Sequence, residues 1–504
     1  MNAGNAGTGE ARPARYAREE MMIQERYSMQ KVERSRYLVE KRPAARALLD
    51  RLCEEYAYAS VLVTDSIGKN YSVSKSGISI SENSTFGGKG MVVRVYDGRG
   101  YAEYSTNEIT MESVPAVLDR IREQLLPVAE KLPENLREAE YRIRQDEPLT
   151  LDQSTEYEIH PQKMGDEKIV SELKTLRQKA LALDGRLLDA DVRLSWQQYH
   201  KLFLSPNRDL EENVLIAESK MTVAAVKDEK VESCLRGYSN LGGAEVLRDM
   251  EAEIPDIVRN VTDLLKAEPM IPGTYECVCT PEVTGMIAHE AFGHGVEMDM
   301  FVKDRAYAQH CIGKRVASDL VTMHDGCAKN EVATYFFDDE GTLSHDTVII
   351  RNGILQTGIS DVQSAMYLGT EPTGNGRRQN YERKAYARMT NTYFEPGKDS
   401  LEDMISSVKY GMLLVEPTSG MEDPKNWGIQ CLVNIAREIK DGKLTGRIFS
   451  PVVLTGYVPD LLKSIFMVSD RMELYGSGAC GKGYKEAVRV SEGGPCIKAQ
   501  IRLG

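Results

Sequence analysis

Residues 289–294, HEAFGH, combine two histidines and a glutamate, side chains that can hold and use a metal ion. Zinc-binding helices often place two histidines four residues apart on one face, with a glutamate beside the first. His289 and His294 are five residues apart, which in a regular helix turns the imidazoles about 140° from each other. They converge only if the helix widens into a π-type turn or ends between them, and Gly293 and Gly295 tolerate the backbone angles needed. The spacing predicts a metal site on a helix that breaks at the glycines; the alternative is a chance pair of histidines.

A third ligand must come from elsewhere in the chain, because a catalytic zinc usually has three protein ligands and one open position. Cys480 lies in YGSGACGKGY, which we expect to form a glycine-rich loop that lets the thiolate approach a metal. For any one cysteine, burial as a small hydrophobic residue is the commoner role. The other candidates are Cys496, His310, His324, Glu297 and Asp299.

The composition is that of a globular chain with an acidic balance. Hydrophobic residues make up 41% of the 504 residues and charged residues 28%, and the formal net charge is -13. This charge argues against nucleic acid as the main partner. There is no run of eighteen apolar residues and no apolar signal segment at the start, so we expect no membrane span and no secretion.

The nine cysteines indicate the redox environment. Their number is odd and no CxxC pair occurs, which favours free thiols in a reducing cytoplasm over a disulfide framework. Cys277 and Cys279, two apart in an expected strand, are predicted to be core residues rather than a metal pair.

The length predicts at least two domains, and PMIPG at 269–273 marks the main boundary. We expect an α+β fold: a disordered start and charged helical extension over 1–41, an N-terminal α/β domain with an antiparallel sheet over 42–268, and a β-rich metal-binding domain over 269–504.

Changes in hydrophobic period predict the N-terminal elements. A charged helix over 14–40 ends before Pro43, which interrupts it. Residues 61–110 alternate like a β-meander, with DGRG at 97–100 as a hairpin turn. The remaining expectations are helices at about 44–58, 111–131, 167–184 and 243–267, strands at about 189–204 and 212–228, and a polar connection over 132–166.

The C-terminal part opens with an expected strand, TYECVCT, and a helix that starts at Pro281 and carries the histidines. NG at 352–353 and DG at 441–442 predict hairpin turns. Two weaker signals are set aside. GSGACGK lacks the Ser or Thr that a phosphate-binding loop needs after its lysine, and DDEG at 338–341 is typical of a solvated turn.

Several motifs together resemble the TldD/PmbA family of peptidases, once described as modulators of DNA gyrase. They are HEAFGHGVEMD, RVASDLVTMHDG, DDEGT, PTGNGRRQNY, RMTNTYFEPG and CGKG, in the family's order. The resemblance covers about 42–504 and is strongest over 281–396. It weakens over PTSGMEDPKNWGIQC at 417–431, and the charged helix at 14–40 is longer than usual, which leaves substrate choice and subunit contacts open.

The resemblance implies a zinc ion held by His289, His294 and Cys480, with Glu290 as the general base. It also implies an N-terminal α/β domain, a β-rich C-terminal domain, and a two-subunit particle around an enclosed site. The PmbA-type partner lacks HExxxH, so this chain resembles the catalytic, TldD-type subunit, in a homodimer or in a heterodimer with a PmbA-type paralogue.

These assignments predict metal-assisted hydrolysis of amide bonds. Zinc lowers the pKa of a bound water, and Glu290 takes the water's proton and passes it to the leaving amine. Glu297 and Asp299 either orient the ligand imidazoles or belong to a solvated helix end. Arg377 and Arg378 either hold a substrate carboxylate or lie in a surface turn.

The expected substrate is an extended or unfolded peptide that adds as a strand. A different class of function remains open: a non-hydrolytic, zinc-containing subunit that binds or regulates a partner protein. Glu290 separates the two hypotheses, because a structural zinc site has no need of a glutamate beside its ligand.

Overall fold

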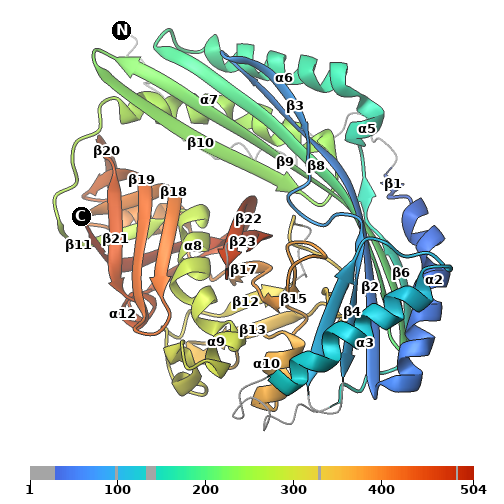
Figure 1. Ribbon diagram of the computed structural model, residues 1–504. Helices are drawn as coiled ribbons and strands as arrows, with labels where there is room; N and C mark the ends of the chain where they lie inside the picture. Colours follow the sequence, from blue (N-terminus) through green and yellow to red (C-terminus); the bar gives the residue numbers. More distant parts are fainter. Residues whose placement is uncertain (1–28, 97–99, 132–142, 327–330, 484–485) are drawn as a thin grey trace, which may run out of the picture.

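The computed structural model describes residues 29–96, 100–131, 143–326, 331–483 and 486–504, and contains two large sheets (Figure 1). The long strands of the N-terminal sheet arch over a strand-rich C-terminal part. This arrangement confirms the expected α+β class. No helix among these residues combines the length and apolar character needed to cross a bilayer.

The N-terminal sheet has the strand order β10-β9-β8-β2-β4-β5, with β3 beside β2 and β6 beside β9. Its neighbours pair antiparallel, as expected, apart from β6, which runs parallel to β9. The strands are β2 (Tyr58–Ser74), β3 (Gly77–Glu82), β4 (Gly90–Tyr96), β5 (Tyr101–Thr106), β6 (Leu149–Ser154), β8 (Leu187–Leu204), β9 (Arg208–Lys227) and β10 (Lys230–Asn240).

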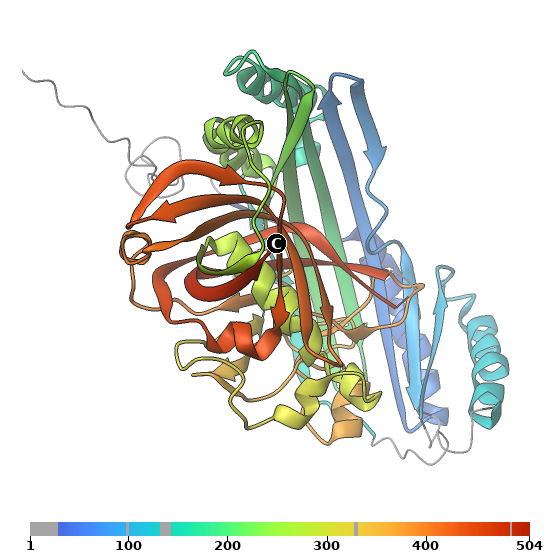
Figure 2. The same ribbon diagram turned by 90° about the vertical axis from the view of Figure 1, so that its left-hand side faces the viewer.

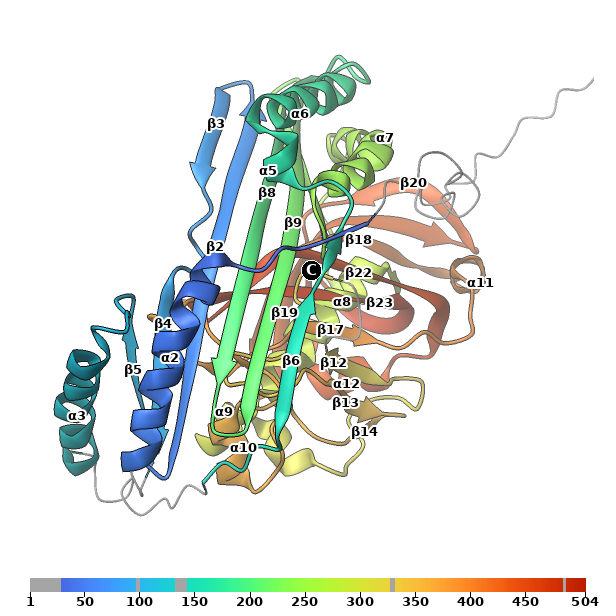
Figure 3. The ribbon, with the colours of Figure 1, turned by 90° about the vertical axis from the view of Figure 1, so that its right-hand side faces the viewer.

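Helices cover this sheet because each carries an apolar stripe. Leucines of α2 pack on β2 and β8, apolar residues of α3 lie against β5 and α2, and the apolar faces of α6 and α7 pack on β8, β9 and β10. Figure 3 shows α2 and α6 on the side turned away from the C-terminal strands. The elements are α2 (Arg36–Glu55), α3 (Val114–Lys131), α5 (Pro161–Met164), α6 (Asp166–Leu181), a 3₁₀ turn (Ala244–Val246), α7 (Leu247–Leu264), and the short pair β1 (Gln30–Lys31) and β7 (Glu156–Tyr157).

Two expectations for this part are wrong. Helix α2 begins at Arg36 and continues through Pro43, so it crosses the boundary expected after residue 41. A proline inside a helix costs about 3 kcal/mol, but Leu38, Leu48 and Leu52 of α2 are fully buried and offset this cost. The connection expected over 132–166 contains β6, β7 and α5. The turn at DGRG and residues 14–28 lie outside the described part.

The C-terminal sheet closes partly on itself. Strands β11, β18, β19, β21 and β23 pair in that order, and β11 also pairs with β23, which completes a ring (Figure 2). Strands β17, β12, β13 and β14 extend the sheet from β23. The bounds are β11 (Gly273–Cys279), β12 (Met323–Gly326), β13 (Asp346–Arg351), β14 (Ile354–Leu355), β17 (Asn391–Phe394), β18 (Tyr410–Asp423), β19 (Gly428–Lys440), β20 (Lys443–Phe449), β21 (Val452–Tyr457), β22 (Met467–Lys482) and β23 (Glu486–Leu503).

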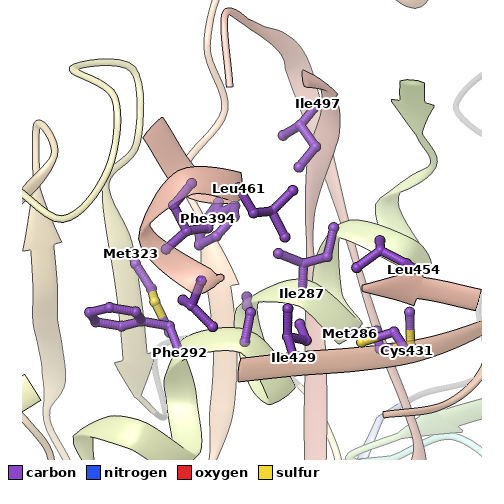
Figure 4. Close-up of a cluster of buried hydrophobic side chains, with 14 of the residues drawn as sticks. Met286, Ile287, Phe292, Met323, Phe394, Ile429, Cys431, Leu454, Leu461 and Ile497 are labelled. Carbon is purple, nitrogen blue, oxygen red and sulfur yellow. The ribbon is translucent and has the colours of Figure 1, made fainter. Parts of the chain in front are cut away.

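The core of this part lies where a helical segment crosses the strands. Met286 and Ile287 of that segment pack against Cys431, Leu454 and other strand residues (Figure 4). The hairpins expected at NG and DG are β13–β14 and β19–β20. The remaining elements are α8 (Pro281–Met286), α9 (Met298–Val302), a 3₁₀ turn (Tyr307–Cys311), α10 (Val362–Leu368), β15 (Gly376–Arg377), β16 (Tyr386–Ala387), α11 (Leu401–Ser406) and α12 (Val458–Lys463).

The DDEG segment, 338–341, joins the two parts and is buried, so the expectation of a solvated turn is wrong. Lys201 Nζ of β8 lies 3.2 Å from Asp339 Oδ1 and donates to the carbonyl of Phe337. Arg94 of β4 pairs with Glu340. Acidic residues are buried here because cations of the N-terminal sheet meet them.

Glu103 of β5 strengthens the same junction. Its carboxylate accepts hydrogen bonds from Arg94 Nε at 2.7 Å and from Arg378 Nη1 at 2.9 Å. Burial raises the pKa of Glu103, but the two guanidinium groups outweigh that effect and hold this pKa well below its usual range.

Candidate metal centre

The helical segment that carries the histidines changes its winding where the spacing requires it. Helix α8 starts at Pro281, a π-helical turn covers Ile287–Gly293, and a 3₁₀ turn covers His294–Val296. The backbone N–H of His294 donates to the carbonyl of His289, five residues back. The two rings therefore face each other, with centroids 5.0 Å apart and planes at 89°. The expected π-type turn is confirmed.

The glycines serve this turn differently from the expectation. Gly293 has φ -58° and ψ -49°, ordinary helical angles, so no unusual backbone is needed there. It is required for space instead, because a Cβ at this position would overlap the sulfur of Met389. Gly285, eight residues earlier in α8, lies against the backbone of Gly493, whose nitrogen would be 2.5 Å from a Cβ. The segment is thus pressed closely between strands β17 and β23.

Cys480 completes the cluster from strand β22, not from a loop. Its Sγ lies 3.3 Å from His294 Nε2, and the ligand atoms of His289, His294 and Cys480 all lie within 4.8 Å of one another. Ligands around a tetrahedral zinc are separated by roughly 3.3–3.6 Å, from metal bonds of about 2.0–2.3 Å. Two imidazoles and one thiolate are a donor set that zinc accepts, so these residues fit a zinc ion.

The electrostatics of the three side chains favour a thiolate. Burial raises the pKa of Cys480, but hydrogen bonds from His289 and His294 outweigh it and lower this pKa to about 4. Burial lowers the pKa of His289, but Cys480 and Glu492 outweigh it and raise this pKa to about 9. A thiolate among positive charges is the arrangement that a divalent cation also satisfies.

Glu297 and Asp299 occupy different places around the cluster. Glu297 is buried, and its Oε2 lies 3.3 Å from His294 Nδ1 and 2.9 Å from Lys482 Nζ. Asp299 contacts Lys482 Nζ, at 2.6 Å, and Lys303, rather than an imidazole. The geometry therefore agrees with the expected orienting role for Glu297 but not for Asp299, and neither lies at a solvated helix end.

Two further residues support the ligands and were missed in the sequence. Glu492 of β23 places Oε2 3.4 Å from His289 Nδ1. Arg388, fully buried, donates from Nη2 to the carbonyl of Cys480 at 2.5 Å, and its Nε lies 3.7 Å from Glu297 Oε1. Arg388 is the first residue of the motif RMTNTYFEPG, so that motif contained a signal for it. Lys482, which contacts Glu297, likewise lies in the motif CGKG.

Glu290 stands beside the cluster without joining it. Its Oε2 lies 3.9 Å from His294 Nε2, and about a fifth of the side chain is exposed. The side chain packs directly on Gly420 of β18. Glu290 can thus meet a molecule that approaches the cluster from the neighbouring pocket.

That pocket has a volume of about 910 Å³ and contains the whole cluster. Consecutive residues of β18 (416–422) and of β22 (478–482) line it. Side chains of a strand alternate in direction, so an unbroken run of lining residues means that the edge of each strand faces the pocket. Among the described residues, the 415–423 half of β18 pairs only with β19, and residues 478–482 of β22 pair only with β23.

The other sequence candidates lie outside the cluster. His324 contacts Glu395 and Asp346, and His310 is exposed near Asp304. Cys496 is buried in a separate apolar cluster, and Cys277 and Cys279 are core residues, as expected.

The structure does not bring Arg377 and Arg378 to the metal cluster. Arg378 pairs with Glu103 of the N-terminal sheet, and Arg377 donates to the carbonyl of Met389 and stacks on Tyr335. Both line a different cavity, at the junction of the two parts. A grip on a substrate carboxylate by Arg377 or Arg378 therefore stays a prediction, and it would take place in this second cavity rather than beside the metal cluster.

Residues 272–492 match the family model described as the PmbA/TldA metallopeptidase C-terminal domain. The protein named Metalloprotease TldD homolog of Buchnera aphidicola subsp. Acyrthosiphon pisum is 36% identical over 238 residues, 47% of this chain and 49% of that protein. The Zinc metalloprotease TldD homolog of Saccharolobus solfataricus is 27% identical over 348 residues, 67% of this chain and 76% of that protein. The chain spans about half the length of the first relatives it matches.

Two solved structures share the fold. A putative modulator of a DNA gyrase from Thermotoga maritima has a TM-score of 0.71 at 16% identity, over 91% of this chain and all of that one. TldE from Thermococcus kodakarensis has a TM-score of 0.69 at 18% identity, over 92% of this chain and all of that one. By residues 272–492 and its TldD-named relatives, the chain is similar to the TldD/PmbA metallopeptidase family.

Proposed function

We propose that the protein is a zinc-dependent peptidase that hydrolyses amide bonds of unfolded or extended peptides. One observation carries the proposal: Glu290 lies beside a convergent His289, His294 and Cys480 cluster in a large pocket. A purely structural zinc site is enclosed by its ligands and keeps no open side. Here the carboxylate of Glu290 stands on the side of the cluster that faces the pocket.

Each residue has a distinct task in the proposed reaction. His289, His294 and Cys480 would hold zinc, which when bound polarises the scissile carbonyl and lowers the pKa of an attacking water. Glu290 accepts the proton of that water and delivers it to the leaving nitrogen. Glu297 and Glu492 fix the orientation of the imidazoles, and ligand orientation of this kind typically changes metal affinity or activity 10–100-fold.

The pocket walls support an extended peptide as the substrate. Two strand edges, from β18 and β22, face the same space as the cluster. Their unpaired backbone groups can hydrogen-bond to the main chain of an added strand and tolerate many side chains. A folded protein offers no such free segment, so we expect unfolded polypeptides to be cleaved and compact ones to resist.

The test is Glu290→Gln, which keeps the side-chain shape and removes the ability to accept a proton. Peptide cleavage should fall at least roughly a hundredfold, because general base catalysis contributes typically 10²–10⁴-fold. Zinc content and thermal stability should stay near those of the wild type. Full cleavage by the variant would refute the assigned base. Absence of cleavage in both proteins, across a library of unstructured peptides, would favour the non-hydrolytic binding subunit.

We further propose that the protein acts in the cytoplasm as one subunit of a two-subunit particle, with itself or with a PmbA-type paralogue. The fold likeness to TldE supports this assembly, and free thiols at the described cysteines suit a reducing compartment. Light scattering at micromolar concentration, alone and mixed with the paralogue, measures the assembly. An active species with the mass of a single chain would contradict it.

A further inference from the structure

A second cavity, of about 80 Å³, lies at the junction between the N-terminal sheet and the C-terminal part. Lys201 of β8, Arg377 of β15, Arg378 and Arg489 of β23 bring four cationic side chains to its walls. None of these residues lines the pocket of the metal cluster. This cavity has no part in the proposed peptidase reaction.

The acidic residues of the cavity are already engaged. Lys201 Nζ lies 3.1 Å from Glu212 Oε1 and 3.2 Å from Asp339 Oδ1. Glu212 also accepts the backbone N–H of Phe336, and Asp339 accepts that of Arg378. Asp338 accepts three backbone N–H groups of its own neighbourhood. In the described part of the chain, none of these three carboxylates forms an ion pair with Arg377 or Arg489.

Arg489 is 93% buried with few partners. Its Nη1 donates to Gln197 Oε1 at 2.6 Å, its Nε lies 3.5 Å from Glu218, and its guanidinium stacks on Phe86 at 4.2 Å. No residue of the described chain accepts a hydrogen bond from Nη2. Burial lowers the pKa of Arg489; Glu218 opposes this effect and the charge of nearby Arg377 adds to it.

Arg377 also makes few hydrogen bonds through its guanidinium group. Only its Nη1 has an acceptor, the carbonyl of Met389, and it forms no ion pair with a carboxylate in the part of the chain that the structure describes. The hydroxyl of Tyr199, which also lines the cavity, has no hydrogen-bond partner among the described residues. An arginine withdrawn from water stays charged and is costly without enough counter-charge; Arg489 is buried with one carboxylate partner, Glu218, and Arg377 is half-buried. Two arginines and a hydroxyl thus bring unused donors to one enclosed space.

We propose that this cavity binds a small oxyanion, a phosphate or a carboxylate group, held between Arg377 and Arg489. A water needs about 10–15 Å³ of such volume, so the cavity has room for an anion of this size with water around it. Guanidinium groups match the paired oxygens of these anions with two parallel hydrogen bonds. Because Tyr199 belongs to β8 and Arg489 to β23, the anion ties the N-terminal sheet to the C-terminal strands.

The experiment uses the zinc-loaded full chain and inorganic phosphate, followed by titration calorimetry and thermal unfolding. Phosphate should bind saturably and raise Tm, because a ligand that binds only the native state stabilises it. Arg377→Gln and Arg489→Gln should each weaken binding at least tenfold. Arg437→Gln is the matched control: Arg437 joins the two parts elsewhere, through Asp263 and Asn260, and its loss should leave phosphate affinity unchanged.

Three outcomes would overturn the proposal. The first is that sodium chloride at the same ionic strength raises Tm as much as phosphate does. The second is that Arg377→Gln and Arg489→Gln both bind phosphate as tightly as the wild type. The third is that Cys480→Ala no longer binds phosphate, which would place the anion at the metal. Should Arg489→Gln fail to fold, Arg377→Gln and the partly restoring Arg377→Lys carry the test. A parallel titration with acetate distinguishes the two kinds of anion. If acetate binds more tightly than phosphate, the natural ligand carries a carboxylate; if phosphate binds more tightly, it carries a phosphate group.

Discussion

Gly420→Ala should disable catalysis without removing the metal. The Cβ added at Gly420 would lie 2.9 Å from Glu290 Cβ and 3.0 Å from its Cδ, and closer still to Cγ, whereas ordinary contacts are 3.4–4 Å. Glu290 must therefore move by about 1 Å, and a misplacement of that size can cost about 10²-fold in rate. We expect kcat/KM to fall about a hundredfold, or about 2.7 kcal/mol, while zinc content stays constant because the ligands do not touch Gly420.

The assay is cleavage of an unstructured peptide by matched variants. Gly428→Ala is the control, since it lies in the same β18–β19 hairpin and its added Cβ would meet only Asp423, at 3.9 Å. In a Glu290→Gln background, Gly420→Ala should have little further effect, because both changes act through one side chain. Wild-type turnover by a folded Gly420→Ala protein would refute the role of Glu290, and additive losses would show that Gly420 acts by another route.

Three other outcomes follow from the structure. Cys480→Ala should abolish zinc binding in metal analysis and Cys496→Ala should not; the reverse would identify a different third ligand. Arg388→Lys keeps the charge but loses the forked geometry, so zinc affinity measured against a chelator should fall about 10–100-fold with the circular dichroism unchanged. Glu103→Gln should cost about 3 kcal/mol in urea unfolding at pH 7, because Arg378 loses its carboxylate partner and Arg94 keeps only Glu340. The pKa of Glu103 is lowered in the folded state, so this stabilisation is full above the ordinary carboxyl pKa of 4.5 and should shrink as pH falls below it; a difference that grows in acid would contradict the assignment.

Local pattern was sufficient to predict the geometry of the histidine helix. Five-residue spacing admits few solutions, and the π-type turn was one of them. The reason given for the glycines was wrong, because the space around Gly293 is set by Met389, almost a hundred residues away. A sequence window shows what a backbone can adopt, but not which distant side chain presses on it.

Residues whose role depends on the tertiary fold could not be predicted in the same way. Glu492 meets His289 only because β23 runs beside α8, and no spacing rule connects the two. The DDEG segment looks like a solvated turn because its charges are counted without Lys201 and Arg94, which come from the other sheet. A charged segment whose partners lie far away in the sequence therefore looks like a surface segment when it is judged by its composition alone.

The contacts around the histidine helix explain how a wide turn can persist in a folded protein. A π-turn is less favourable than a regular helix, but Ile287 and Phe292 are fully buried, and each such side chain contributes about 1.5–3 kcal/mol. Close glycine contacts fix the segment further, through Gly285 on Gly493 and Gly293 on Met389. The imidazoles are therefore positioned by packing within this chain alone. Metal binding should need no second subunit, and any dependence of activity on assembly must then arise at the open pocket, where we propose that the peptide binds.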